Sequence, residues 1–177
     1  MPIEPLKKLV PPPRNPSEVG SLQQWEAIER DLGLELPSDY RDFVFTYGSG
    51  RFAKFYGIYN PFAASQYAAL LPSIQRVCAA ERETKRDWPE IVPYPIYPDQ
   101  PGLLPWGCDD NGNYYFWLTE GTSDFWPVLS DEVRGEGFRE YHCTMTEFLI
   151  GILQGEFEAL AGDYPRDEHR IFEAWTG

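Results

Sequence analysis

The stretch LPWGCDDNGNYYFWL, residues 104–118, decides how this chain folds. Asn111-Gly112 is the dipeptide most typical of a two-residue type I′ hairpin turn, because both central positions of that turn need a positive φ angle. The chain is therefore expected to reverse there, between two antiparallel strands. Every position from 114 to 118 is aromatic or aliphatic, so both faces of the second strand are apolar. Such a strand is typical of the centre of a sheet covered on both sides, and Trp106 and Trp117 are expected in its aromatic core.

The polar tip of this hairpin matches a calcium-binding loop only in part. Four residues stand at positions 1, 3, 5 and 12 of such a loop: Asp109, Asn111, Asn113 and Glu120. Position 6 must be glycine for the loop to turn, and here it is Tyr114. A polar hairpin tip is therefore expected instead of a metal site.

No other pattern in the sequence indicates catalysis. The only histidines are His142 and His169, and His142 precedes Cys143 in a predicted strand, where neighbours point to opposite faces. Cysteines and histidines lack the spacing of a zinc site, and no glycine-rich phosphate loop follows a strand. We expect no catalytic residues, metal or cofactor, and therefore no enzyme.

Acidic residues are concentrated in the second half of the chain. Residues 1–98 contain 11 lysines and arginines against 12 aspartates and glutamates, whereas residues 99–177 contain 4 against 16. Most of the net charge of −13 therefore lies after residue 98. Such a surface repels phosphate backbones and attracts cationic proteins. The composition disfavours a nucleic-acid partner and favours a basic protein.

The length of 177 residues fits one domain with a sizeable core. Three widely separated cysteines fit reduced thiols in the cytoplasm, and neither a signal peptide nor a membrane-spanning run is apparent. We expect a proline-rich extended arm over residues 1–20, a single domain over 21–177, and a C-terminal extension over 163–177.

Local signals predict the remaining elements. Capping boxes at Ser21 and Thr144 begin two helices, which Gly33 and Gly162 are expected to end, and another helix begins at Ser38. A strand is expected over residues 51–59. It is followed by a helix whose charged end, residues 81–87, is expected to face solvent. Residues 93–101 are expected to form an irregular segment or an edge strand. Strands at 125–129 and 138–143 and a short helix in the tail complete the prediction.

Four segments resemble the SUKH family: LGLELPSDYRDFVFTYGSGRF at 32–52, LLPWGCDDNGNYYFW at 103–117, DFWPVL at 124–129 and TEFLIGIL at 146–153. The resemblance implies an α+β fold with a twisted, mainly antiparallel sheet of about four to six strands and helices packed against it. It also implies that the motif residues are structural; these include Pro37, Tyr40, Gly48, Gly50, Trp106, Gly107, Gly112 and Trp117.

The SUKH family includes fungal cell-wall-synthesis regulators and bacterial immunity proteins that neutralise toxins. The resemblance therefore implies a cytoplasmic immunity-type protein that binds a cognate toxin, such as a basic nuclease. Two alternatives remain open: a general protein-interaction or regulatory module, and an acidic small-molecule or carbohydrate binder. The expected toxin contacts are loop acids that flank the hairpin tip and the acidic strand connection: Asp109, Asp110, Asp124, Asp131, Glu132 and Glu136.

Overall fold

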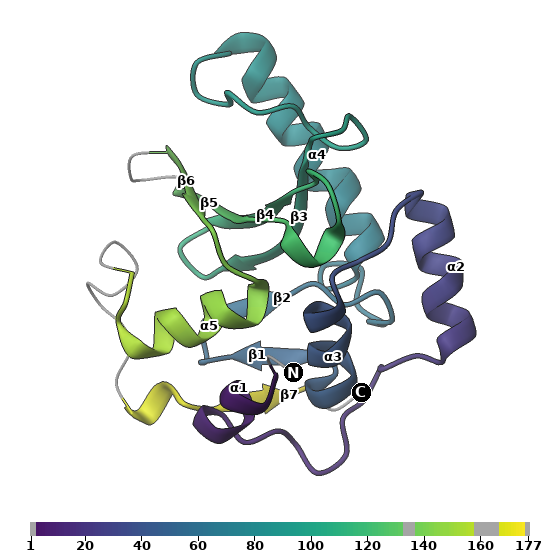
Figure 1. Ribbon diagram of the computed structural model, residues 1–177, viewed down its shortest axis with the longest axis vertical. Helices are drawn as coiled ribbons and strands as arrows, with labels where there is room; N and C mark the ends of the chain where they lie inside the picture. The colour runs from purple at the N-terminus through teal and green to yellow at the C-terminus, as the bar shows by residue number, and fades with distance from the viewer. Residues whose placement is uncertain (1–2, 133–136, 158–166, 176–177) are drawn as a thin grey trace.

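The computed structural model describes residues 3–132, 137–157 and 167–175 and shows an α+β fold (Figure 1). Seven antiparallel strands form one open sheet in the order β6-β5-β4-β3-β2-β1-β7. The strands are β1 Gly50–Phe52, β2 Tyr56–Ile58, β3 Leu103–Asp109, β4 Tyr114–Leu118, β5 Val128–Glu132, β6 Gly137–Tyr141 and β7 Phe172–Ala174. The helices are α1 Ile3–Leu9, α2 Leu22–Leu32, α3 Ser38–Tyr47, α4 Leu70–Asp87 and α5 Met145–Gln154, with short 3-10 helices η1 Ser123–Phe125 and η2 Asp167–His169.

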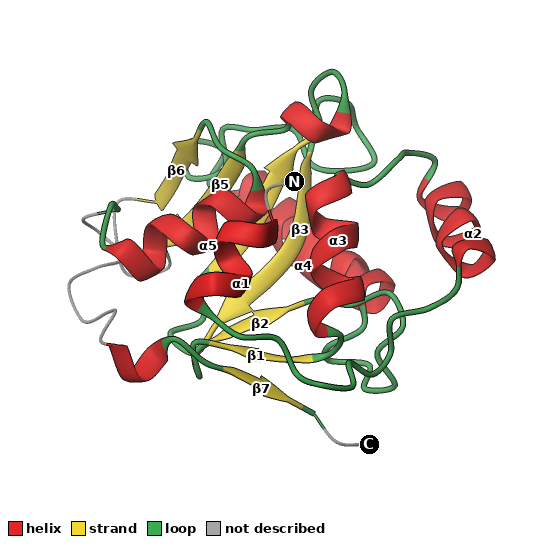
Figure 2. Ribbon diagram, turned by 60° about the horizontal axis from the view of Figure 1, so that its bottom comes forward, coloured by secondary structure: helices red, strands yellow, loops and turns green. Residues whose placement is uncertain are grey.

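Helices cover both faces of the sheet. Figure 2 shows α1, α3 and α5 on one face and α4 on the other. The capping boxes at Ser21 and Thr144 are both formed and begin α2 and α5. The sequence therefore predicted the α+β class and the starts of these helices correctly. None of the helices in the described ranges is long and apolar enough to cross a lipid bilayer.

β4 is an interior strand of the sheet and is buried on both faces, as expected. On one face, the ring of Trp117 lies 5.1 Å from that of Tyr40 in α3, and the ring of Tyr115 lies 5.5 Å from that of Phe148 in α5. On the other face, Phe116 packs 5.7 Å from Phe138. Each aromatic body thus contributes hydrophobic burial and an oriented ring contact to the same core.

The hairpin before β4 has a three-residue loop, not the predicted two-residue type I′ turn. The amide of Gly112 donates to the carbonyl of Asp109 at 3.1 Å, and the amide of Asp109 donates to the carbonyl of Asn113 at 3.0 Å. Only Gly112 in this loop has a positive φ angle, +88°. This is the geometry of a tight turn followed by a left-handed residue, which still needs glycine at position 112.

The segment predicted as one strand, residues 51–59, is instead the β1–β2 hairpin. Ala53 and Lys54 both have positive φ angles, 55° and 59°, and reverse the chain between the two strands. Neither residue is one that favours this conformation, so the sequence carried no turn signal there.

The N-terminal segment 1–20 is not simply an extended arm. Ile3 and Leu6 are one helical turn apart in α1, and both are buried together with Val10. The hydroxyl of Tyr47 donates to the carbonyl of Val10 at 2.7 Å and fixes the end of α1 against α3. The triple proline begins only after this helix, at residue 11, so it does not prevent helix formation.

The last helix ends earlier than predicted, and the tail forms a strand. Gly155, in a left-handed conformation, ends α5 instead of Gly162, which lies outside the described residues. The described part of the tail contains a short helix, η2, but Phe172, which was expected in that helix, instead belongs to β7, which pairs with β1. Gly50 permits this pairing, because a Cβ atom there would lie 2.5 Å from the carbonyl oxygen of Glu173.

Candidate interaction site

The six acids predicted to contact a partner do not share one surface. Asp109 and Asp110 lie where β3 enters the hairpin loop, and Asp131 lies at the same end of the sheet, paired with Tyr114 of β4. Glu132 follows Asp131 in β5. Asp124 belongs to η1, which follows β4 at the opposite end of the sheet. Glu136 lies outside the described residues.

Asp109 is a structural residue. Its side chain is only 7 % exposed, and its Oδ1 accepts the backbone amides of Asn111 and Asn113 at 2.9 and 3.0 Å. Its Oδ2 accepts the side-chain amide of Asn113 at 2.9 Å and the hydroxyl of Tyr115 at 2.7 Å. These four bonds occupy both carboxylate oxygens and hold the hairpin loop closed. Asp109 is therefore not available to a partner.

Asp124 also acts within the fold. Its Oδ1 accepts the amide of Ser38 at 2.7 Å, one of the first amides of α3 that has no partner inside the helix. This hydrogen bond lowers the pKa of Asp124, and the charge of Arg41 acts in the same direction. Asp124 caps a helix that begins 86 residues before it, a role that no local sequence signal indicates.

The acids at the hairpin end of the sheet have different surroundings. Asp110 is paired with Arg51 of β1, and both side chains remain partly exposed. Burial, and then the charge of Glu132, raises the pKa of Asp131. The Oε1 atom of Glu132 is buried and has no hydrogen-bond partner among the described residues.

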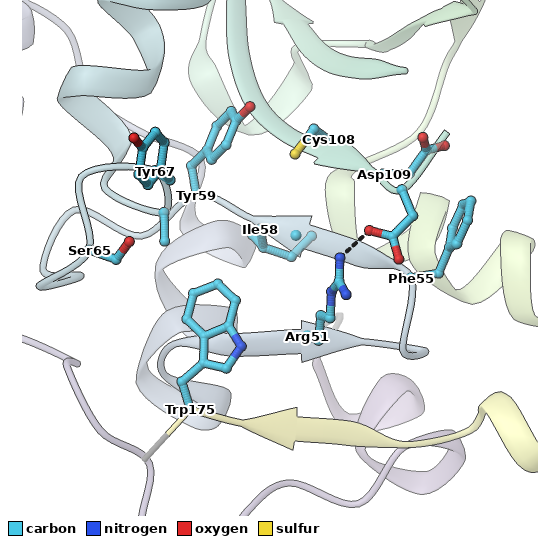
Figure 3. Close-up of a pocket in the computed structure, with 12 residues that line it drawn as sticks. Arg51, Phe55, Ile58, Tyr59, Ser65, Tyr67, Cys108, Asp109 and Trp175 are labelled. Carbon is cyan, nitrogen blue, oxygen red and sulfur yellow. Dashed lines mark hydrogen bonds and ion pairs between the residues drawn. The ribbon is translucent and has the colours of Figure 1, made fainter. Parts of the chain in front are cut away.

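A cavity of about 360 Å³ opens between β1, β2, β3 and the segment before α4 (Figure 3). Aromatic side chains gather around it, and two of them are open to solvent: Tyr67 is 72 % exposed and Trp175 is 40 % exposed. Arg51, from the ion pair with Asp110, also lines the cavity. No pattern in the sequence indicates this cavity, because its walls come from segments that are far apart in the chain.

The cavity does not contain the parts of a nucleophilic site. Cys108 lines it, but burial raises the pKa of this thiol, which disfavours the reactive thiolate. His142 is exposed, at the far end of β6. No group of three potential metal ligands occurs among the residues that were placed.

Glu81 is the acidic residue that sequence analysis missed. It was expected on the solvated face of a charged helix end, but it is only 6 % exposed and lines a groove together with Asp131 and Glu132. A signal for its burial existed: Glu81 follows Ile74 by seven residues and Cys78 by three, so all three share one face of α4.

Several residues of the recognised sequence motif have clear structural roles. Pro37 precedes α3, and the hydroxyl of Tyr40 donates to the carbonyl of Tyr59 at 2.6 Å. Gly48 lies against the backbone of Ser17, because a Cβ atom there would be 2.1 Å from that residue's carbonyl oxygen. Trp106 and Trp117 are completely or almost completely buried.

A family profile matches most of the chain. The profile of the SUKH_6 family, described as SMI1-KNR4 cell-wall, matches residues 22–149. The match confirms the resemblance drawn from the motif segments and includes α2 to β6 and the beginning of α5. No curated protein and no solved structure matches the chain.

Proposed function

Because the chain belongs to the SUKH_6 family of SMI1-KNR4 cell-wall proteins, we propose that it is a cytoplasmic immunity-type protein that binds and neutralises a basic toxin. Family membership is compatible with an immunity or regulatory role through protein interaction, and proteins of this family are generally non-catalytic. Binding alone can neutralise a toxin if it covers the surface that the toxin needs for its own substrate.

The distribution of charge is the observation that supports a basic partner most directly. Residues 99–177 contain 16 acidic residues and 4 lysines and arginines. Within this half, Asp110, Asp131 and Glu132 lie at the hairpin end of the sheet, and none of them is used as Asp109 and Asp124 are, to hold a loop or cap a helix. A toxin that cuts nucleic acid must carry a basic surface to bind phosphates, and this acidic end can cover it.

The test first seeks a candidate toxin among the genes beside this one, and then measures the association rate of that toxin with this protein across a salt series. Asp131→Asn/Glu132→Gln removes two charges from the hairpin end. The control, Asp99→Asn/Glu120→Gln, also removes two charges, but from exposed residues near the start of β3 and the end of β4. These residues lie at the end of the sheet opposite the hairpin. Electrostatic steering raises association rates by about 10- to 1,000-fold and weakens with salt. The first pair should slow association and flatten its salt dependence more than the second.

Equal effects of the two pairs would mean that steering depends on total charge and not on this end of the sheet. Failure of the wild-type protein to bind or inhibit the neighbouring toxin would overturn the immunity proposal itself.

The aromatic cavity supports a second candidate function, the binding of a small molecule such as a carbohydrate. Tyr67 and Trp175 expose large ring surfaces beside a concave space of about 360 Å³, an arrangement that suits stacking against a sugar ring. A calorimetric screen of sugars against wild type and Tyr67→Ala decides it. Binding that is lost in the variant supports this function, and no binding by wild type excludes it for the sugars tested.

A further inference from the structure

The groove that Glu81 lines is a separate feature from the aromatic cavity. Its volume is about 710 Å³, and its walls are the second half of α4, the segment 90–94, and residues of β4, β5 and β6. Figure 1 shows these elements together at the end of the molecule away from β1 and β7. The groove therefore does not share its walls with the cavity of Figure 3.

Glu81 places a carboxylate in this groove without a partner. The residue is only 6 % exposed. Nevertheless, neither a hydrogen bond nor an ion pair joins its carboxylate to any residue that the structure describes. Asp131 faces it closely enough to raise its pKa, second only to burial as a cause. An uncompensated buried carboxylate is costly, so proteins normally pair it.

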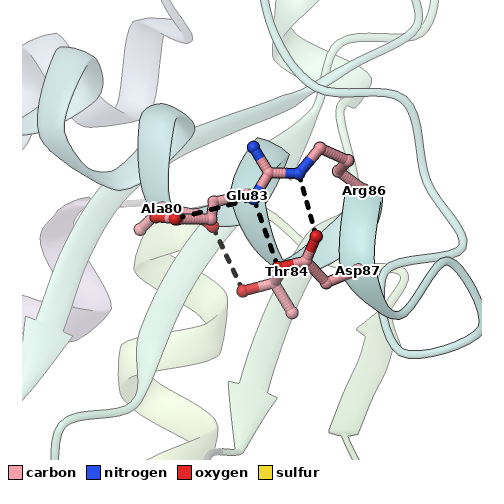
Figure 4. A network of polar contacts seen from close by, with 5 residues as sticks. All are labelled: Ala80, Glu83, Thr84, Arg86 and Asp87. Atoms are coloured by element: carbon pink, nitrogen blue, oxygen red, sulfur yellow. Dashed lines mark hydrogen bonds and ion pairs between the residues drawn. The ribbon is translucent and has the colours of Figure 1, made fainter.

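The basic residues of α4 near Glu81 are already engaged elsewhere. Lys85 donates to the carbonyls of Val92 and Tyr94 at 2.9 and 2.7 Å, and Arg82 donates to the carbonyl of Tyr97. Arg86 lies beside Glu83 and Asp87 in the network of Figure 4. Within the described chain, none of these three cations neutralises Glu81.

The other walls of the groove suit the stem of a long cationic side chain. Tyr94, Tyr114 and Phe138 line it, and the rings of Tyr94 and Phe138 lie 5.6 Å apart. Lysine and arginine bury their methylene stems against apolar surface while the charged end seeks an acceptor. Aromatic faces also attract such cations. The groove thus combines an apolar wall with carboxylates for which the described residues show no counter-charge.

We propose that this groove receives one lysine or arginine side chain of the basic protein partner, with its cationic end paired to Glu81 and Asp131. The proposal rests on the proposed function for the source of the side chain. It adds a specific anchor to the general attraction between charged surfaces. A cation held in a partly desolvated pocket acts mainly on dissociation, whereas exposed surface charges act mainly on association.

The first experiment tests the chemistry of the groove without a partner. Nα-acetyl-lysine N-methylamide and Nα-acetyl-arginine N-methylamide are titrated into protein with ¹³C-labelled carboxyl groups, and Nα-acetyl-norleucine N-methylamide is the neutral control. At least one cationic probe should shift the Glu81 and Asp131 carboxyl signals saturably, and Glu81→Gln should abolish this binding. Glu83→Gln, on the exposed part of the same helix, should preserve it. The proposal would be overturned if neither cationic probe shifted the Glu81 and Asp131 carboxyl signals, or if the norleucine control shifted them equally.

The second experiment measures dissociation of the neighbouring toxin. Glu81→Gln should raise the dissociation rate by about tenfold or more, whereas Glu83→Gln should change it by less than about twofold. Equal rates for the two variants would overturn the assignment of the groove to the partner. If the wild-type protein binds no toxin, the proposed function is wrong and the partner cannot be the source of the cationic side chain. The probe titration still decides whether the groove binds a cation.

Discussion

Gly112 allows the chain to reverse between β3 and β4, since its φ angle of +88° is one that a side chain with a Cβ atom resists. Apart from Gly112 and its two chain neighbours, no described residue has an atom within 4 Å of the position where a Cβ atom would be. The cost of a substitution there is therefore backbone strain and not a steric clash with a neighbour. This separation makes position 112 a clean test of the loop geometry.

Gly112→Val should lower the free energy of unfolding by about 1–3 kcal/mol, because a β-branched residue is held in a left-handed conformation. Asn111→Ser is the control, since the side chain at position 111 is exposed. Chemical denaturation of the two variants and wild type measures the difference. Equal midpoints for all three proteins would contradict the assigned loop.

Glu81 makes stability depend on pH. Burial, followed by the charge of Asp131, raises its pKa from an ordinary value of 4.5 to about 7 in the folded state. Between these two pH values the unfolded chain has already released the proton that the folded protein retains. The contribution of Glu81 to stability is therefore fully present below pH 4.5 and falls as pH rises through 7.

Glu81→Gln should remove this dependence. Its free energy of unfolding should match that of wild type near pH 4 and exceed it by about 1–3 kcal/mol at pH 8, because glutamine cannot ionise. Glu83→Gln controls for the loss of one charge from α4. Denaturation at both pH values provides the measurement. A variant that is less stable than wild type at pH 8 would show that ionised Glu81 has a compensating partner.

At the scale of elements, the starts of α3 and α5 are joined by one buried carboxylate. The Oδ2 atom of Asp39 accepts the amide and the hydroxyl of Thr146 at 2.8 and 3.0 Å. Burial raises the pKa of Asp39, and these hydrogen bonds oppose that rise. The two helices thus share a buried polar contact at their first turns.

Asp39→Ala should lower the free energy of unfolding by about 1–3 kcal/mol, because it leaves the buried amide of Thr146 without an acceptor. Asp39→Asn retains a carbonyl acceptor and should cost less. Asp42→Ala lies on the same helix but outside this contact, so it should change stability by less than about 0.5 kcal/mol. Thermal unfolding of the three variants compares them; similar losses for Asp39→Ala and Asp42→Ala would contradict the joining role.

Element starts could be predicted from the sequence where the signal is local. The side chain of Ser21 accepts the backbone amide of Gln24, and the side chain of Gln24 accepts that of Ser21. Four consecutive residues are therefore enough to predict the start of α2. Contacts between segments that are distant in the chain have no comparable local sequence pattern. The bond from Ser38 to Asp124 and the groove between α4 and β5 depend on packing that brings separate segments together. Only part of the candidate site was therefore predictable.

At the scale of the whole molecule, 28 acidic residues against 15 lysines and arginines produce net repulsion within the folded chain. Salt screens such repulsion over distances of about 10 Å at 0.1 M. The melting temperature should therefore rise as sodium chloride increases from low to moderate concentration. Asp99→Asn/Glu120→Gln, which removes two exposed acids, should show a smaller rise. A melting temperature that falls with salt would mean that attractive ion pairs outweigh repulsion.

The pairing of β7 with β1 is the strand pairing that we expect to form last during folding. All other neighbours in the sheet are consecutive strands, whereas this pairing joins Gly50 to Ala174 and needs the chain to close a long loop. β7 also lies beyond residues 22–149, which the family profile matches. We expect the six-stranded sheet to assemble first and β7 to attach afterwards. In native-state hydrogen exchange, the amides of 172–174 should then open before those of β4, at a free energy well below that of global unfolding.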